Sequence, residues 1–200
     1  MKGDYMANKT CRPLTDVELE KVILTIRNGY VGKDGVYRRP NPQISFAIWL
    51  EANLGLRIGD IKNLKLCNFF KKNANDYYLS IIEKKTGKRK ELYCPTIVYD
   101  HIVNYCLDNN INTKQQIIKC SVRNVQKYIK YVAEYLELGD NVSTHSMRKR
   151  FATQVYEQSG FDLLLLQSIL LHSSPAISKR YVGLNTIKQK EILDITTKII

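Results

Sequence analysis

The chain has 200 residues, of which 44% are hydrophobic and 25% charged, an ordinary mixture for one globular domain with a proper core. Its formal net charge is +12, from 31 Lys and Arg against 19 Asp and Glu, and this surplus favours a polyanionic partner such as nucleic acid. Since no apolar run reaches the length of a spanning helix and the N-terminus is no secretory signal, we expect a cytoplasmic protein without a membrane partner.

The cysteines give no sign of a disulfide framework or a metal site. They are odd in number, scattered along the chain, and never spaced as Cys-x-x-Cys. We therefore interpret them as reduced packing residues, and we expect no zinc site. The five are Cys11, Cys67, Cys94, Cys106 and Cys120.

The first half of the chain predicts helices separated by a polar loop. Residues 1–13 are interpreted as a loosely held basic leader. Thr15, with Glu18 three positions later, is a capping box that predicts a helix ending at Gly29. Residues 30–41 are expected to form a polar loop with no regular structure.

A second helix is predicted to begin at Pro42, which suits a first helical turn, and to stop near Gly55. Arg57 therefore stands just beyond the end of this helix, before a short helix through Ile61 and Leu64.

The middle of the chain predicts a β-hairpin, and the remainder predicts helices. Residues 77–83 and 89–94 are rich in strand-favouring side chains, and Thr86-Gly87 between them marks a turn. Residues 65–70 are expected to add a third strand. The fold class is mainly α with one small antiparallel β-sheet (α+β). The later helices are expected over residues 96–108, 121–138, 144–160, 163–171, 174–181 and 186–199.

Five side chains suited to phosphodiester chemistry follow one another along the chain. Arg57 is followed by His145-x-x-Arg148, then by His172, and nine positions later by Tyr181. A guanidinium fork grips two phosphate oxygens and stays charged at any working pH. His145 and Arg148, three apart in the first turn of a predicted helix, are expected on one face near a helix N-terminus that favours anions.

This order and spacing resemble the tyrosine recombinase (phage integrase) family over nearly the whole chain, from about Pro13 to Tyr181 and into the tail. The chain departs from the usual pattern at Leu171, where glycine commonly precedes the second histidine, and at Asp60, where glutamate is commoner. The resemblance implies a catalytic DNA breaking-rejoining domain over residues 14–183. It also implies a C-terminal helix over 184–200, which packs either on its own domain or on a neighbouring protomer.

The resemblance also implies a role for each catalytic residue. Arg57 and Arg148, with His145, surround the scissile phosphate, and His172 donates a hydrogen bond to a non-bridging oxygen. Tyr181 attacks phosphorus to form a 3′-phosphotyrosine, which conserves the bond energy for rejoining. A lysine at the hairpin turn protonates the leaving 5′-oxygen. Lys85 fits the family's Lys-Thr-Gly form, and the alternatives are Lys84 and Lys88. No metal or other cofactor is expected.

Two clusters of basic residues are predicted DNA contacts. The hairpin turn contributes four of its basic residues, and a predicted helix carries three more on the side opposite its apolar face. The simpler interpretation of each is a solvated surface. The residues are Lys84, Lys88, Arg89, Lys90, Arg123, Lys127 and Lys130.

The sequence thus predicts site-specific recombination of a mobile element by cleavage and rejoining of duplex DNA. Integration, excision, inversion and resolution all stay open. The resemblance implies a homotetramer assembled on DNA, leaves open a free monomer, and places the protein in a bacterial or phage-encoded, nucleoid-associated setting. Because almost nothing precedes the catalytic domain, we expect weak, salt-sensitive DNA binding. The alternatives are a DNA-binding accessory protein with this fold and a type IB topoisomerase-like nicking-closing enzyme.

Overall fold

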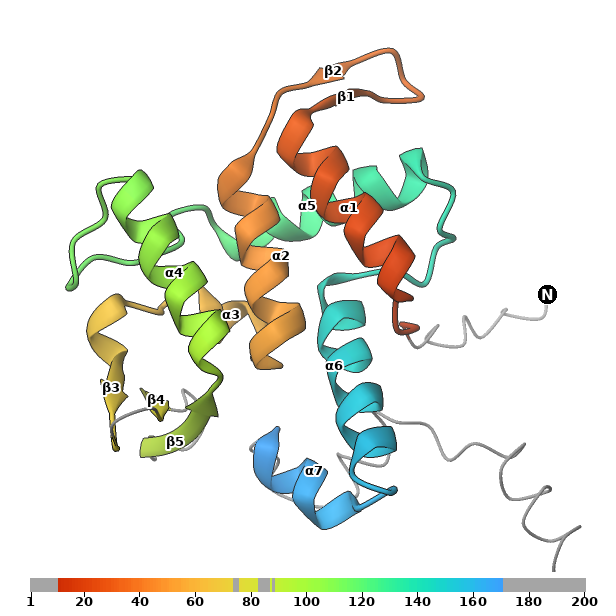
Figure 1. Ribbon diagram of the computed structural model, residues 1–200. Coiled ribbons are helices and arrows are strands. Elements are labelled where there is room, and N and C mark those ends of the chain that lie inside the picture. Colours follow the sequence, from red (N-terminus) through yellow and green to blue (C-terminus); the bar gives the residue numbers. More distant parts are fainter. Residues whose placement is uncertain (1–10, 74–75, 83–86, 88, 171–200) are drawn as a thin grey trace, which may run out of the picture. The chain divides into compact units, whose positions relative to one another are not determined.

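The computed structural model describes residues 11–73, 76–82, 87 and 89–170 (Figure 1). Contacts divide the chain into two compact units, Met1–Phe151 and Ala152–Ile200, and helix α6 begins in the first and continues into the second. The described elements are α1 (Asp16–Asn28), β1 (Tyr30–Val31), β2 (Tyr37–Arg38), α2 (Pro42–Leu54), α3 (Ile58–Ile61), the 3-10 turn η1 (Leu66–Asn68), β3 (Phe69–Lys71), β4 (Tyr77–Ile82), β5 (Arg89–Cys94), α4 (Thr96–Asp108), α5 (Val122–Tyr135), α6 (Thr144–Gln158) and α7 (Leu163–Ile169).

The capping box at the start of α1 is confirmed. The Glu18 amide donates to the Thr15 hydroxyl, and the Glu18 carboxylate accepts from the Thr15 amide at 2.8 Å. Arg12 grips the same carboxylate with both terminal nitrogens, at 2.8 and 2.6 Å, and also donates to the Leu138 carbonyl at 2.9 Å. The Arg12 hydrogen bonds lower the pKa of Glu18 to about 2. The segment before α1 is therefore tied to the loop that follows α5.

Part of the segment between α1 and α2 is ordered where a plain loop was expected. Strands β1 and β2 pair antiparallel, with Tyr30 opposite Arg38. The Arg38 guanidinium lies 4.2 Å from the ring centroid of Tyr131 on α5 and forms an ion pair with Asp34 at 2.7 Å. Because strands of two residues leave no period-2 pattern to read, only the polar character of this segment is visible in the sequence.

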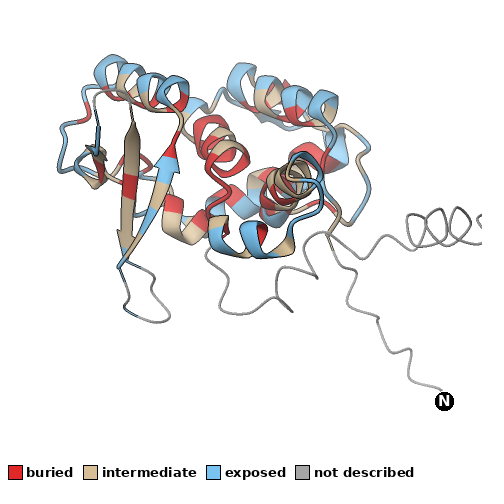
Figure 2. Ribbon diagram, turned by 60° about the horizontal axis from the view of Figure 1, so that its bottom comes forward, coloured by how far each residue is buried: buried red, intermediate tan, exposed pale blue. Residues whose placement is uncertain are grey.

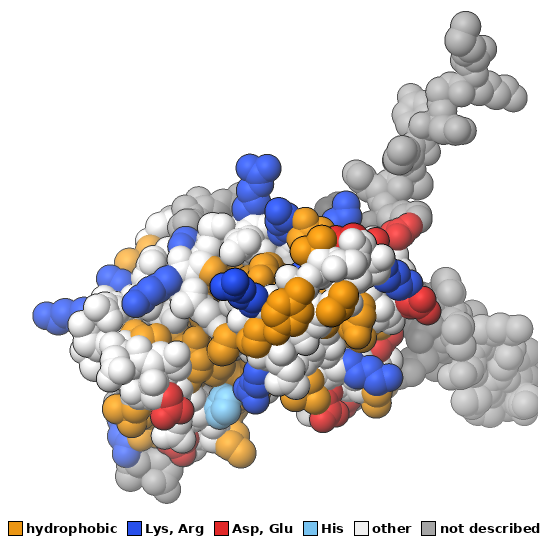
Figure 3. Space-filling model, turned by 90° about the horizontal axis from the view of Figure 1, so that it is seen from above, with side chains coloured by type: hydrophobic (Ala, Val, Ile, Leu, Met, Phe, Trp, Pro, Cys, Tyr) orange, Lys and Arg blue, Asp and Glu red, His pale blue; other side chains and the backbone are white. Residues whose placement is uncertain are grey.

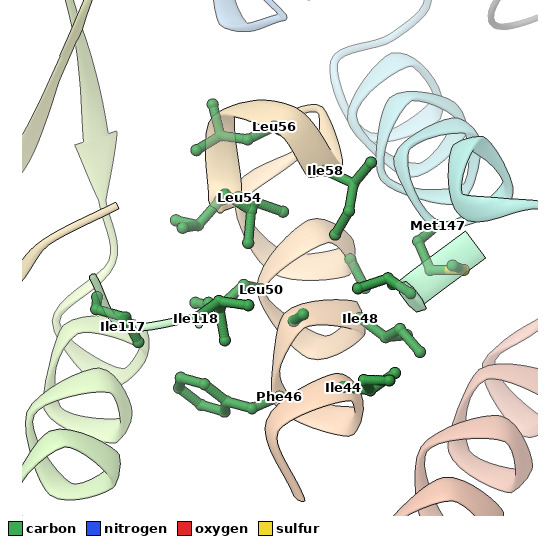
Figure 4. Packing of buried hydrophobic residues seen from close by; sticks show 14 of the residues in the cluster. Ile44, Phe46, Ile48, Leu50, Leu54, Leu56, Ile58, Ile117, Ile118 and Met147 are labelled. Atoms are coloured by element: carbon green, nitrogen blue, oxygen red, sulfur yellow. The ribbon is translucent and has the colours of Figure 1, made fainter. Parts of the chain in front are cut away.

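Helix α2 is the centre of the core. It is apolar on nearly every side, as expected for a helix surrounded by other elements, and it is mostly buried in Figure 2. Ile44 and Ile48 point to one side while Phe46 and Leu50 point to the other, and Ile117 lies beyond the latter pair (Figure 4). The helix ends as predicted at Gly55, which takes the left-handed conformation at φ 61°.

The small sheet has the strand order β3-β4-β5, all antiparallel, so the predicted hairpin and its third strand are confirmed. The third strand covers residues 69–71, slightly later than expected, because residues 66–68 form the turn η1. Leu79 and Cys94 are buried on the side of the sheet that faces the core. Tyr77 stacks there on Tyr99 of α4, with ring centroids 3.8 Å apart.

The later helices that the structure describes match the prediction, with earlier ends for α5, α6 and α7. Helix α5 stops at Tyr135 because Glu137 takes a positive φ of 56° and the Leu138 amide turns back to the Ala133 carbonyl. Asp162 caps α7 as predicted, accepting from two backbone amides. The helices predicted over residues 174–181 and 186–199 lie outside the described residues.

The prediction that the cysteines are packing residues is confirmed only in part. All five cysteines are free thiols, and Cys94 and Cys106 are buried, where burial raises the pKa of the Cys94 thiol to about 11. Cys67 is exposed, so its interpretation as a packing residue was wrong. Among the described residues, no helix is long and apolar enough to cross a membrane.

Replacing Gly55 by alanine is expected to lower the free energy of unfolding by about 2–5 kcal/mol, combining left-handed strain with overpacking. A β-carbon at this position would collide with the ring of Phe151. Urea unfolding measures the loss. Gly35→Ala is the matched control, because φ there is 72° and nothing lies within 4 Å of an added β-carbon, so only about 1–2 kcal/mol should be lost. Equal losses in the two variants would show that a collision with the ring of Phe151 does not add to the destabilisation at residue 55.

Candidate active site

Arg57 is positioned by the break between α2 and α3. The chain leaves α2 at Gly55, buries Leu56, and begins α3 directly after Arg57. The Arg57 carbonyl accepts from the amides of Asp60 and Ile61 at 2.8 and 3.0 Å, which fixes the backbone from which the guanidinium extends. Arg57 is half-buried, so it lies where the core meets the surface.

His145 and Arg148 lie in the first turns of α6, as predicted, but their environments differ. Ser143 and Ser146 exchange hydrogen bonds at the helix start, at 2.9 and 3.1 Å. Met147 enters the core, His145 is exposed, and Arg148 is only 2% exposed. The start of α6 therefore carries an exposed imidazole, that of His145, and a buried guanidinium, that of Arg148.

A hydrogen bond from Arg148 joins the two predicted motifs. Its Nη1 donates to the carbonyl of Gly55, a residue 93 positions earlier in the chain. The same turn of α2 meets α6 a second time, because Gly55 leaves room for the ring of Phe151. Arg148 is thus fixed against the backbone from which Arg57 emerges, two residues later.

The charges of the three residues act on one another. The pKa of His145 is lowered from 6.5, first by partial burial of the imidazole among its neighbours, then by the positive charges of Arg148 and Arg57. The structure therefore brings together three of the predicted catalytic groups, from the two separate motifs. Two guanidinium groups beside the imidazole therefore disfavour its protonated form.

The remaining predicted catalytic residues lie outside the described residues. They are Lys85, His172 and Tyr181, together with the alternatives Lys84 and Lys88. Of the other hairpin residues, Arg89 is exposed and its Nε donates to the Ser80 hydroxyl at 2.8 Å, while Lys90 is half-buried opposite Ile81.

The predicted basic surface on α5 consists of Arg123, Lys127 and Lys130, and all three side chains are exposed. The opposite side of the helix is apolar and buried, for example at Ile129 and Val132. Lys127 lies over the ring of Tyr131, 5.6 Å from its centroid. Lys and Arg side chains are spread across the face shown in Figure 3, with Asp and Glu mainly towards its edges.

Sequence reasoning missed Glu51. This residue is the one charged side chain of α2, and it is fully buried one turn before Gly55. Burial raises its pKa well above 4.5, against the opposing charge of Arg148 and the backbone N–H of Ile58. The available signal was a single carboxylate in an otherwise uncharged helix. Among the described residues, no three His, Cys, Asp or Glu side chains are grouped to hold a metal ion.

Comparison with known proteins identifies the family. Residues 43–187 match the phage integrase family, and the chain belongs to it. It is 30% identical over 138 residues to the probable integrase/recombinase YoeC of Bacillus subtilis (strain 168), covering 66% of this chain and 73% of that protein. It is 24% identical over 189 residues to the tyrosine recombinase XerA of Pyrococcus furiosus, covering 92% of this chain and 61% of XerA.

Solved structures with the same fold confirm the predicted fold class. The XerH site-specific recombinase bound to palindromic difH substrate, in a post-cleavage complex, matches with a TM-score of 0.67 and 19% identity, over 95% of this chain and 54% of XerH. The catalytic domain of bacteriophage HP1 integrase matches with a TM-score of 0.61 and 16% identity, over 86% of each chain. The chain therefore has the fold of a tyrosine recombinase catalytic domain and spans about half the length of XerH.

The pKa of His145 is expected to lie below 6.5 and to rise when Arg57 is replaced by glutamine, because one of the two nearby cations is removed. Proton NMR titration of the imidazole measures it, with His145→Gln to assign the signal. The imidazole of His145 binds a proton at higher pH in the unfolded chain than in the folded chain. Protonation of His145 should therefore lower the free energy of unfolding as the pH falls below 6.5.

Exposed Arg39 supplies the control for this titration, since Arg39→Gln also removes one positive charge. The pKa of His145 should stay unchanged in that variant. An equal rise in both variants would mean that net charge, rather than the neighbouring guanidinium, sets the pKa.

Proposed function

We infer that this chain cuts and rejoins duplex DNA at specific sites through a transient 3′-phosphotyrosine at Tyr181. The observation that carries this proposal is the meeting of Arg57, His145 and Arg148, which lie far apart in sequence and share one electrostatic environment. Two guanidinium groups and an imidazole are suited to the extra negative charge of a pentavalent phosphorus. Family membership supports the same reaction class.

The proposed reaction proceeds in two balanced steps. The Tyr181 hydroxyl gives its proton to solvent and its oxygen attacks phosphorus, while the bond to the 5′-oxygen breaks and Lys85 supplies the proton to that oxygen. In rejoining, a 5′-hydroxyl gives its proton to Lys85 and attacks the phosphotyrosine, whose bond to the Tyr181 oxygen breaks, and that oxygen takes a proton from solvent. One phosphate ester replaces another in each step, so no external energy source is consumed. Arg57 and Arg148 hold the phosphate oxygens, and His145 and His172 donate hydrogen bonds to them.

The proposed partner is double-stranded DNA bound by a homotetramer that assembles on two sites. The net charge of +12 and the exposed basic residues of α5 support DNA as the partner. XerH is a related fold whose structure is a complex with its DNA substrate. Recombination of a mobile element is the proposed role, in a bacterial or phage setting.

Tyr181→Phe is expected to abolish both plasmid relaxation and the covalent protein–DNA adduct, because the nucleophilic oxygen is removed. The measurement incubates the protein with supercoiled plasmid at low salt in EDTA, quenches with detergent, and resolves DNA topology and protein-linked DNA on gels. Exposed Tyr93 provides the matched control, since Tyr93→Phe should retain both products. An adduct that survives in Tyr181→Phe would assign the nucleophile to another residue.

Replacing Arg123 and Lys130 together by glutamine should weaken DNA binding at all sequences, because phosphate contacts are lost. The slope of log affinity against log salt should fall by about one for each contact removed. Fluorescence anisotropy with a labelled duplex over a salt series measures this. Lys21→Gln, exposed on α1, serves as a control that should leave the slope unchanged. An unchanged slope in the α5 variant would exclude this surface from the DNA interface.

A further inference from the structure

Glu51 is a buried carboxylate for which the proposed reaction has no use. Its side chain is 0% exposed, and α2 carries no other charged residue. Neither carboxylate oxygen has a hydrogen bond within normal geometric limits among the described residues. A charged group in such a place is costly unless another charge or a proton compensates it.

The groups around Glu51 all belong to the candidate active site. From α6 the neighbouring charge is Arg148, itself only 2% exposed, and from the start of α3 the backbone N–H of Ile58 faces the carboxylate. Among the described residues these are the groups that act on it, and α1 and α5 contribute no charge. Arg148 donates to the carbonyl of Gly55, whose amide closes the last helical turn of α2 on the Glu51 carbonyl at 3.1 Å, so the guanidinium is held at the turn of α2 that follows Glu51.

Each of the two buried ions alone would be unfavourable. A buried guanidinium without a counter-charge and a buried carboxylate without one both lose their hydration, whereas a pair of them cancels in charge. The opposing charge of Arg148 lowers the pKa of Glu51, but burial raises it by more, so the carboxylate takes up a proton more readily than usual. Protonation of Glu51 therefore removes the attraction between the two charges.

A phosphate bound at the site changes the pKa of Glu51. Its negative charge satisfies Arg148 and at the same time repels the Glu51 carboxylate, which favours the protonated acid. We propose that Glu51 is the built-in counter-ion of Arg148, and that it accepts a proton from solvent when the scissile phosphate pairs with the guanidinium. Glu51 is thus a positioning residue that acts through Arg148, and this inference rests on the proposed DNA-cleaving function.

The first experiment follows Glu51 without DNA. Carbon-13 NMR of protein labelled in its glutamate side chains gives a titration for each carboxyl, and the signal missing in Glu51→Gln identifies Glu51. Its midpoint should lie above 4.5 in the unmodified chain and rise further in Arg148→Met, which removes the opposing charge. Arg148→Lys, which keeps the charge on a different side chain, should give a smaller rise and serves if Arg148→Met does not fold.

The second experiment measures adduct formation on supercoiled plasmid across a pH series. Glu51→Gln keeps the shape of the neutral acid and cannot ionise, so it should match the unmodified chain at low pH. Above the titration midpoint the ratio of its rate to the unmodified rate should rise, by up to about tenfold per pH unit. A role in packing alone would give a ratio that does not change with pH.

Glu20→Gln is the matched control, because Glu20 is exposed on α1 and its replacement should leave the rate ratio near one at every pH. The inference is overturned if the Glu51 midpoint is at or below 4.5, if it is the same in the Arg148 variants, or if the Glu51→Gln ratio is flat. A chain that makes no adduct refutes the proposed function and the proton exchange with phosphate. The NMR titration then still decides whether Glu51 and Arg148 are paired.

Discussion

The hydrogen bond from the Arg148 guanidinium to the Gly55 carbonyl is the contact on which the candidate site depends. It joins α6 to the turn between α2 and α3, across 93 positions of sequence. Helix α2 is surrounded by the core, so the turn at its end has little freedom to move. This hydrogen bond, together with the packing of the Phe151 ring on Gly55, positions Arg57, which follows that turn, relative to His145, which precedes Arg148 on α6.

A core of ordinary packing therefore supports a site with two guanidinium groups, one buried and one half-buried. The guanidinium of Arg148 is buried, so its charge acts through a medium that screens it less than water would. Its effect reaches the exposed imidazole of His145, which stays neutral more readily than a free histidine. The buried carboxylate of Glu51 interacts electrostatically with Arg148 as well. The charges of the site are thus coupled, so the pKa of each titratable group depends on whether its neighbours are charged.

Much of this arrangement can be read in the sequence. The capping box at Thr15, the stop at Gly55 and the hairpin are predictable because each depends on local chemistry over a few residues. The family motifs also single out Arg57, His145 and Arg148 by the order and spacing of side chains alone. None of these predictions requires knowledge of how distant segments pack.

Other features were beyond that reasoning because they depend on contacts between distant segments. The burial of Arg148 follows from how α6 meets α2, which no spacing rule contains. The pairing of β1 with β2 is supported by Arg38 lying on a ring of α5. Glu51 was visible as an isolated charge, but only its neighbours reveal why it matters. Sequence order predicts the reactive groups, and tertiary packing sets the electrostatic environment of the three that the structure describes.

The hydrogen bonds of Arg12 reduce the conformational entropy of the loop that leads into α6. Arg12 holds both the Leu138 carbonyl and, through its own amide, the Asn141 carbonyl at 3.0 Å. A loop anchored at two interior points has fewer accessible conformations than one anchored at its ends alone. The first turn of α6 is thus already ordered before any ligand arrives, and binding need not supply the free energy to immobilise it.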